Sequence, residues 1–213
     1  MDDKRVRQWE KCIGRIETNH HDIKWHRPYE STRFKTSRGT GFFVQAGSLP
    51  AGLVRPGGSR PHFMITCAHV IANAKVTNAR VGLKDNPSKL YDAAVVLSCP
   101  AIDVAVLLVF LPPEVAVTSL PLGNSDVLRA GNKVHVVGFP LGKEVKVTSG
   151  DFSGMSSHGI QHSSPISPGN SGCPLIFDGK VVGVNYQGET GADVSNMHYA
   201  VPINLVGVIL QDA

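Results

Sequence analysis

The chain has 213 residues, of which 42% are hydrophobic and 18% charged. This composition excludes a disordered polypeptide and suffices for one large domain or two small barrels. The formal net charge of +4 comes from residues 1–40, which hold ten Lys or Arg against six Asp or Glu, whereas the remainder holds eleven of each. We interpret this excess as a solvated arm and expect no nucleic-acid partner.

Three features of the sequence bear on the compartment. The first residues, MDDKRVRQWEK, are charged and lack the apolar centre of a signal peptide. The longest apolar run, Val104 to Pro113, is too short for a membrane span. Four cysteines occur, none in a CxxC motif, and they predict free thiols: Cys12, Cys67, Cys99 and Cys173. We therefore expect a soluble protein of the cytoplasm or nucleus, with no signal peptide and no membrane insertion.

Short apolar runs bounded by Gly- and Pro-rich turns predict β-strands along most of the chain. These runs are Thr77–Leu83, Ala93–Leu97, Val104–Phe110, Lys133–Val137, Val145–Ser149, Leu175–Phe177, Val181–Tyr186 and His198–Val201. The irregular stretch Gln45–Arg60 predicts an extended hairpin loop between two apolar runs. Asp178-Gly179, between two of the runs, predicts a two-residue type I′ turn.

The end of the chain has helical rather than strand periodicity. Pro202 suits a helix start, and the apolar residues that follow share one helical face: Ile203, Val206, Ile209 and Leu210. The sequence therefore predicts an all-β, antiparallel barrel-type fold closed by a short C-terminal helix.

Three islands of the sequence carry reactive side chains. His69 ends an apolar strand, Asp103 stands immediately before another, and Ser171 lies between two glycines in SPGNSGCP. Each alone has an ordinary structural interpretation. Together they offer a nucleophile, a base and an anion in the order histidine, aspartate, serine, which is the order of the double-barrel serine proteases.

The segments around these residues resemble those of one known family. TCAHV, DVAVLLV and SPGNSGCPL resemble the TNAHV, DIAVL and NPGNSGGPL segments of the HtrA/Deg serine proteases, a trypsin-like branch, and GTGFFV resembles their GSGFI segment. The resemblance runs from about residue 36 to about residue 206. It implies two packed six-stranded antiparallel β-barrels, at about residues 36–112 and 120–213. Residues 1–35 would then be a basic and aromatic segment that packs on the protease or assembles it.

The resemblance also implies the roles of individual residues. Ser171 would attack the peptide carbonyl to form an acyl-enzyme, His69 would act as general base and then acid, and Asp103 would orient His69. The backbone N–H groups of Gly169 and Ser171 would form an oxyanion hole, with the Asn170 N–H nearby. The implied activity is endopeptidase cleavage of unfolded or partly unfolded polypeptides in protein quality control, with no cofactor and no metal.

Two departures from related patterns affect this interpretation. Asn170 stands where secreted digestive relatives carry an aspartate that pairs with a new N-terminal amine, so we predict no zymogen cleavage and a loop ordered by other contacts. Cys173 replaces a glycine, and we favour a thiol that packs as a small hydrophobe. The alternative is that Cys67 and Cys173 lie close enough for oxidation to join the barrels; Cys173 as the nucleophile is disfavoured because Ser171 occupies that place.

The specificity pocket is expected around Pro165, Ile166, Asn185 and Tyr186. Because none of these is acidic, an apolar residue of small or medium size is the expected P1 residue of the substrate.

Further expectations concern domains and assembly. Relatives usually continue into PDZ domains, for which this sequence leaves no room, and many are trimers assembled through aromatic N-terminal residues. The residues that could take this role in a homotrimer are Trp9, Trp25 and Tyr29, although they could equally cover the barrel.

Two alternatives to catalysis by this chain remain open from the sequence. A latent protease fold could serve as a binding or chaperone-like module if its oxyanion loop were disordered. A metal site could use the cluster Cys12, His20, His21 and His26, but this spacing matches no zinc pattern and favours a surface cluster.

Overall fold

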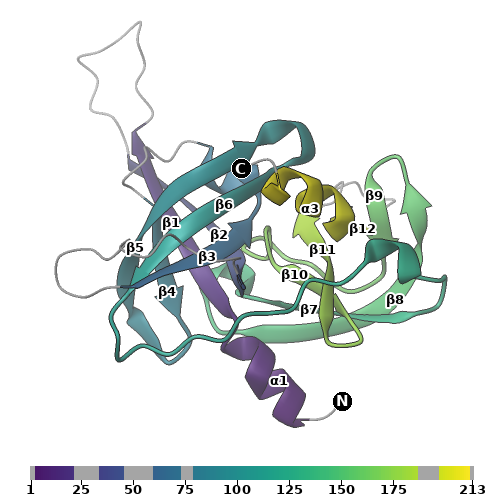
Figure 1. Ribbon diagram of the computed structural model, residues 1–213, viewed down its shortest axis with the longest axis horizontal. Coiled ribbons are helices and arrows are strands. Elements are labelled where there is room, and N and C mark those ends of the chain that lie inside the picture. Colours follow the sequence, from purple (N-terminus) through teal and green to yellow (C-terminus); the bar gives the residue numbers. More distant parts are fainter. Residues whose placement is uncertain (1–2, 22–33, 46–59, 73–78, 187–196, 212–213) are drawn as a thin grey trace, which may run out of the picture.

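A computed structural model of the chain describes residues 3–21, 34–45, 60–72, 79–186 and 197–211. Figure 1 shows two barrels side by side, with a helix at each end of the described chain. The helices are α1 (Asp3–Glu10), α2 (Ala68–Ile71) and α3 (Ile203–Gln211), and the short 3-10 helices are η1 (Pro100–Ile102), η2 (Ser125–Val127) and η3 (Pro140–Gly142).

The first barrel consists of the strands β1 (Ile13–His21), β2 (Phe34–Val44), β3 (Arg60–Thr66), β4 (Ala79–Leu83), β5 (Asn86–Cys99) and β6 (Val104–Leu111). Its antiparallel order is β1-β2-β3-β6-β5-β4, and it closes where β1 pairs with β4. The strand β6, VAVLLVFL, is buried along almost its whole length because it lies between β3 and β5 with the core on one side and covering segments on the other.

The sequence-based boundary at residue 36 is therefore wrong, because the first barrel begins with β1. Residues of β1 alternate between the barrel interior and the surface, where Glu17 pairs with Arg15 and Arg38. Only every second residue of β1 needs to be buried, so its charged surface residues interrupt the apolar pattern. The strand therefore does not stand out as an apolar run in the sequence.

The second barrel consists of β7 (Lys133–Gly138), β8 (Lys146–Ser156), β9 (Gly159–His162), β10 (Pro174–Phe177), β11 (Lys180–Tyr186) and β12 (His198–Pro202). Its order, β10-β11-β12-β9-β8-β7, repeats that of the first barrel, although the sequence shows no internal repeat. Between β10 and β11, Asp178 and Gly179 both have positive φ values, 46° and 75°, which agrees with the predicted type I′ turn. The predicted fold of two six-stranded antiparallel barrels is confirmed.

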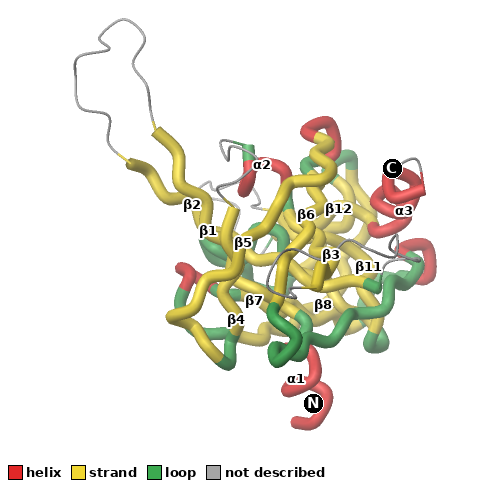
Figure 2. The backbone as a smooth tube through the Cα atoms, turned by 60° about the vertical axis from the view of Figure 1, so that its left-hand side comes forward, coloured by secondary structure: helices red, strands yellow, loops and turns green. Residues whose placement is uncertain are grey.

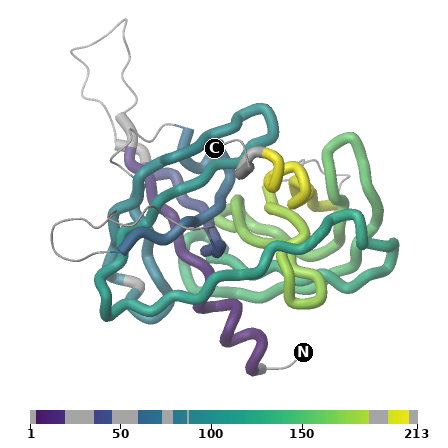
Figure 3. Tube along the Cα trace, viewed as in Figure 1, coloured from purple at the N-terminus to yellow at the C-terminus, as the bar shows by residue number. Residues whose placement is uncertain are grey.

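One core cluster joins the two barrels, and the second barrel has a further cluster of its own. The largest cluster of buried side chains starts at Trp9 and Ile13 and continues into the second barrel through Val137, Ile176 and Val184. The segment that joins the barrels crosses between them after β6, as the change of colour in Figure 3 shows. Because the barrels meet through buried apolar side chains, residues from both can be fixed against each other at the junction.

The N-terminal helix α1 is fixed to the barrels. Figure 2 shows it below them, and its Trp9 is buried with its ring 5.4 Å from that of His135 on β7. Trp9 therefore covers the fold within a single chain. Trp25, Tyr29 and His26 lie outside the described residues.

The predicted terminal helix is present as α3, with Ile203 and Val206 buried against the second barrel. Pro202 is the last residue of β12 rather than the first of the helix. Among the residues that the structure describes, no helix is long and apolar enough to cross a membrane.

Candidate active site

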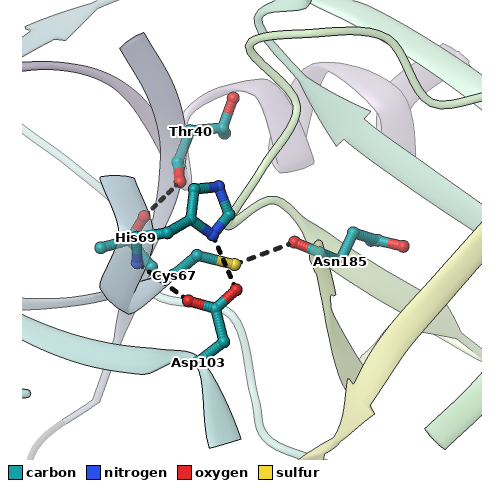
Figure 4. A network of polar contacts seen from close by, with 6 residues as sticks. Thr40, Cys67, His69, Asp103 and Asn185 are labelled. Atoms are coloured by element: carbon teal, nitrogen blue, oxygen red, sulfur yellow. Dashed lines mark hydrogen bonds and ion pairs between the residues drawn. The ribbon is translucent and has the colours of Figure 1, made fainter. Parts of the chain in front are cut away.

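His69 and Asp103 form a hydrogen-bonded pair where two strands of the first barrel end. His69 lies on α2, directly after β3, and Asp103 lies between η1 and β6. The His69 backbone N–H donates to Asp103 Oδ1 over 2.8 Å, and His69 Nδ1 is 2.7 Å from Asp103 Oδ2 (Figure 4). A carboxylate can only accept here, so the pair favours the tautomer with its proton on Nδ1 and a free lone pair on Nε2.

The environment of Asp103 keeps its carboxyl group ionised. Burial raises its pKa, but hydrogen bonds from the His69 side chain and backbone outweigh this effect and lower the pKa overall. The backbone is left-handed at Asp103, with φ 54° and ψ 43°, and the Asp103 N–H donates to Pro100 O. The tight turn thus aims the carboxylate back at α2.

Ser171 belongs to the second barrel, where it lies in the loop before β10, and this loop packs on the end of β3. Its carbonyl accepts a hydrogen bond from the Thr40 N–H over 2.8 Å. The next residue, Gly172, is packed so closely that an added Cβ would lie 2.2 Å from Thr66 Oγ1 and 2.9 Å from Cys67 N. The loop therefore lies beside the two residues that lead to His69.

The same loop has two backbone N–H groups for which the described residues provide no acceptor. Pro168 O accepts from Leu141 N over 2.6 Å, and Asn170 O accepts from Cys173 N over 2.9 Å. Since the C=O and N–H of a trans peptide point in opposite directions, the N–H groups of Gly169 and Ser171 point away from Leu141 N and Cys173 N, respectively. Neither donates to any acceptor in the described part of the chain.

The third predicted oxyanion donor, Asn170, is different. Its N–H donates to Ser167 O over 3.0 Å, so it is already used to shape the loop. The Asn170 side chain is buried, and its Oδ1 accepts from no described residue. Gly169, the first of these donors, has φ 94°, and an added Cβ would lie 2.6 Å from Phe139 O, which explains why a glycine is needed there.

Thr40 on β2 holds this loop in place, and it is a residue that the sequence analysis missed. Its hydroxyl donates to Gly169 O over 2.8 Å and accepts from the Phe139 N–H over 3.0 Å, while its backbone N–H binds Ser171 O. Its own carbonyl accepts from the Thr66 hydroxyl. One buried side chain of the first barrel thus binds both the loop and the segment that the loop packs on.

The segment after β7 is also held from the first barrel. Leu141, whose N–H binds Pro168 O, has a strained φ of 57° for a non-glycine residue. Arg15 on β1 donates from Nη1 to Gly142 O over 3.1 Å, which fixes the peptide that follows. The orientation of the Gly169 N–H therefore depends on contacts between the two barrels.

The four residues predicted to line the specificity pocket have different environments. Pro165 is exposed, and Ile166 is half-buried. Tyr186 lines a cavity of about 350 Å³ together with Asp103. Asn185 is fully buried: its Oδ1 lies 2.8 Å from His162 Nε2, and its Nδ2 donates to Cys173 O, so its amide is used inside the protein instead of being presented to a ligand.

The cysteines are free thiols, as predicted. Cys173 is fully buried in the core of the second barrel, which agrees with its interpretation as a small hydrophobe. Cys67 Sγ donates to Asn185 O over 3.2 Å. Cys12 lies in the core rather than in a surface cluster, and burial raises its pKa to about 11.

Comparisons with known proteins identify the family of the chain. Residues 39–184 match the trypsin-like peptidase domain family. The chain is 34% identical over 166 residues to the serine protease Do-like HtrA of Bacillus subtilis, which covers 70% of this chain and 36% of that protein. It is 31% identical over 156 residues to the periplasmic serine endoprotease DegP of Salmonella typhimurium, covering 68% and 31%, respectively.

The fold has a solved counterpart in the HtrA-type protease AlgW with a decapeptide. The TM-score is 0.73 at 24% identity, covering 98% of this chain and 66% of that one, so this likeness concerns the fold alone. The chain spans about a third of the length of the curated relatives it matches.

The comparisons contradict the predicted location in the cytoplasm or nucleus. The relatives include proteases named as periplasmic, at 31% and 34% identity, and one from Bos taurus named as mitochondrial, at 29%. The charged first residues and the free thiols are therefore poor guides to the compartment in this case.

The fold, the match over residues 39–184 and the identity to HtrA and DegP proteases lead to one assignment. The chain belongs to the trypsin-like peptidases, as a serine endopeptidase domain of the HtrA type.

Proposed function

We propose that this chain hydrolyses peptide bonds through Ser171 as nucleophile, His69 as general base and acid, and Asp103 as the group that orients His69. The observation that carries the proposal is the pair of N–H groups at Gly169 and Ser171, which have no acceptor among the described residues and lie in the loop that packs beside an intact histidine–carboxylate pair. A loop that bonded these groups internally would have no such donors for a substrate.

In the first half of the reaction, Ser171 Oγ attacks the substrate carbonyl and passes its proton to His69 Nε2. The imidazolium that forms keeps its Nδ1–H on Asp103 Oδ2, whose negative charge stabilises it. The pKa of Asp103 is lowered, so this carboxylate stays ionised throughout the neutral range.

The tetrahedral intermediate places a negative charge on the former carbonyl oxygen. The N–H groups of Gly169 and Ser171 donate to this oxyanion, and each such donor is worth about 3 kcal/mol of transition-state stabilisation. His69 then protonates the leaving amine, and water hydrolyses the acyl-enzyme by the same steps in reverse. None of these steps uses a metal or a cofactor.

We further propose that the substrates are unfolded or partly unfolded polypeptides, cleaved after an apolar residue. Support for an apolar P1 residue comes from the candidate residues themselves, since Ile166 is half-buried and no carboxylate is among the four. A peptide library in which Arg or Lys is preferred at P1 would contradict this part.

The experiment is cleavage of β-casein by the purified chain beside its Ser171→Ala variant, with a chelator present. We expect cleavage by the wild-type chain and none by Ser171→Ala. Ser167→Ala is the matched control, because this exposed serine lies in the same loop and its backbone carbonyl is kept. A fluorophosphonate probe should label the wild type and Ser167→Ala, each at Ser171. Equal cleavage by Ser171→Ala would contradict the proposal.

A homotrimer stays a prediction from the family resemblance. Trp9, one of its three candidate contact residues, is buried within the single chain, which leaves assembly to other surfaces. Light scattering of the purified Ser171→Ala variant would give the number of subunits directly.

A further inference from the structure

We propose that Cys67, His69 and Asp103 together form a binding site for a thiophilic divalent cation such as Zn²⁺, and that the bound ion switches the protease off. The inference rests on the proposed function for its consequence but not for the site itself. One ligand atom from each of the three residues lies within 4.8 Å of the other two.

The three donors are of the types that zinc prefers. Thiolate sulfur, imidazole nitrogen and carboxylate oxygen bind Zn²⁺ at about 2.0–2.3 Å, which places the donors of a tetrahedral ion about 3.5 Å apart. The observed separations extend from 2.7 Å, between His69 Nδ1 and Asp103 Oδ2, to no more than 4.8 Å. Shifts of about 1 Å in side-chain position therefore suffice to enclose an ion.

The charges at this point also favour a cation. The Asp103 carboxylate lies close to the fully buried Cys67 thiol. A divalent ion bound between them would balance the charge of the carboxylate and of the thiolate that forms on binding. The thiol releases its proton to solvent when the ion binds.

The site can be reached from solvent. The His69 side chain is 47% exposed and that of Asp103 is 28% exposed. Both line a cavity of about 530 Å³ beside α2 and the end of β5, and Asp103 also borders the 350 Å³ cavity near Tyr186. An ion can thus reach His69 and Asp103 directly, whereas the Cys67 thiol is fully buried and lines neither cavity, so side chains must move before it binds the ion.

Binding at this point would stop catalysis for a simple chemical reason. A neutral imidazole that binds a metal through Nδ1 carries its proton on Nε2. The Nε2 atom of His69 then has no lone pair to accept the Ser171 proton, and Asp103 no longer orients the ring. The substrate pocket is untouched, so the ion should lower kcat and leave KM nearly unchanged.

The first test is inhibition of β-casein cleavage by Zn²⁺ after removal of chelator, with each variant compared with its own metal-free rate. Wild type and Cys173→Ala should be inhibited at the same zinc concentration, whereas Cys67→Ala should need at least about tenfold more. Cys173→Ala is the matched control because it removes a second fully buried thiol next to Asn185. Equal inhibition of Cys67→Ala and wild type would overturn the proposal.

The second test does not depend on activity. The Ser171→Ala variant is titrated with Cd²⁺ or Co²⁺, whose bonds to thiolate give charge-transfer absorption bands. We expect such a band in the Ser171→Ala variant and no band in the double variant that carries both Ser171→Ala and Cys67→Ala. Circular dichroism shows whether both variants are folded. A missing band in folded Ser171→Ala would reject the site even if the protease is active. A clear band in a chain that cleaves nothing would instead support the site and reject the proposed function.

Discussion

At the scale of single residues, the hydroxyl group of Thr40 links the nucleophile loop to the first barrel. It binds Gly169 O and Phe139 N at the same time, and both partners belong to the second half of the chain. Without it, the Gly169 carbonyl loses a donor and the buried Phe139 N–H loses its acceptor. The peptides that carry the two proposed oxyanion donors would then be free to rotate.

Thr40→Val should therefore lower kcat by about 10- to 100-fold with little change in KM, because the loss falls on the transition state. Thr40→Ser keeps the hydroxyl and should restore most of the rate. Thr18→Val is the control: its hydroxyl is also buried but binds Val70 O and does not contact the loop. Wild-type kcat in Thr40→Val, or an equal loss in Thr18→Val, would contradict this role.

His69, Asp103 and Ser171 could be proposed from the sequence because each stands in a short motif whose neighbours are also distinctive, and the structure brings His69 and Asp103 into contact. Thr40 could not, although its segment was noticed. Its hydroxyl has partners 99 and 129 residues away along the chain, and no local pattern records contacts of that length. The hydrogen bond from the Asn170 N–H to Ser167 O could not be predicted either, because it depends on the conformation of the loop.

At the scale of elements, the turn that carries Ser171 depends on close contact between backbones. Gly172 has φ 86°, and an added Cβ would lie 2.3 Å from Thr40 O as well as 2.2 Å from Thr66 Oγ1. Gly179 in the β10–β11 turn has a similar φ of 75°, but nothing lies within 4 Å of its added Cβ. A substitution at Gly179 therefore tests the cost of left-handed backbone alone, whereas a substitution at Gly172 also tests the cost of crowding by neighbouring atoms.

We expect Gly179→Ala to lower the free energy of unfolding by about 1 kcal/mol, the cost of left-handed backbone alone. Gly172→Ala should lower it by about 3 kcal/mol or more and abolish cleavage, because Thr40 and Thr66 must move. Urea unfolding in the Ser171→Ala background measures both without self-cleavage. Equal losses for the two variants would show that crowding at Gly172 is relieved at no cost.

Strand prediction depended on whether both faces of a strand are apolar. The fully buried β6 and the hairpin of β10 and β11 were predicted because their residues are apolar in succession. The strand β1 was missed because its outward residues, such as Arg15 and Glu17, pair with each other and with Arg38 across the sheet. The strands that pair with β1 in the first barrel could not be identified from any local stretch of the sequence.

At the scale of the whole molecule, stability should depend on pH through buried His162. Its Nδ1 accepts from the Ser164 N–H and its Nε2 lies 2.8 Å from Asn185 Oδ1, an arrangement that requires the neutral ring. Burial lowers its pKa to about 4, against a raising effect of Asn185 and a further lowering by His198. The pKa values of His62, His135 and His198 are lowered as well, mainly by burial.

The buried histidines bind protons at a higher pH in the unfolded chain than in the folded one. The contribution of neutral His162 to the free energy of unfolding is therefore complete above pH 6.5 and is lost as the pH falls toward 4. The loss for His162 alone is about 3 kcal/mol. Urea unfolding of Ser171→Ala at several pH values should show this slope, which His162→Gln should reduce and the exposed-site change His158→Gln should leave intact. A stability that is constant from pH 7 to 4.5 would contradict the assignment.

The double-barrel architecture was predicted from the family resemblance, but the start of the first barrel was not. The strand β1 pairs with β2 on one side and with β4 on the other. A chain shortened to begin at residue 36 would keep every residue proposed for catalysis, yet it would expose two unpaired strand edges where the barrel had been closed. Such edges recruit strands from other molecules. Truncation at this point would therefore turn a protease domain into a self-associating sheet.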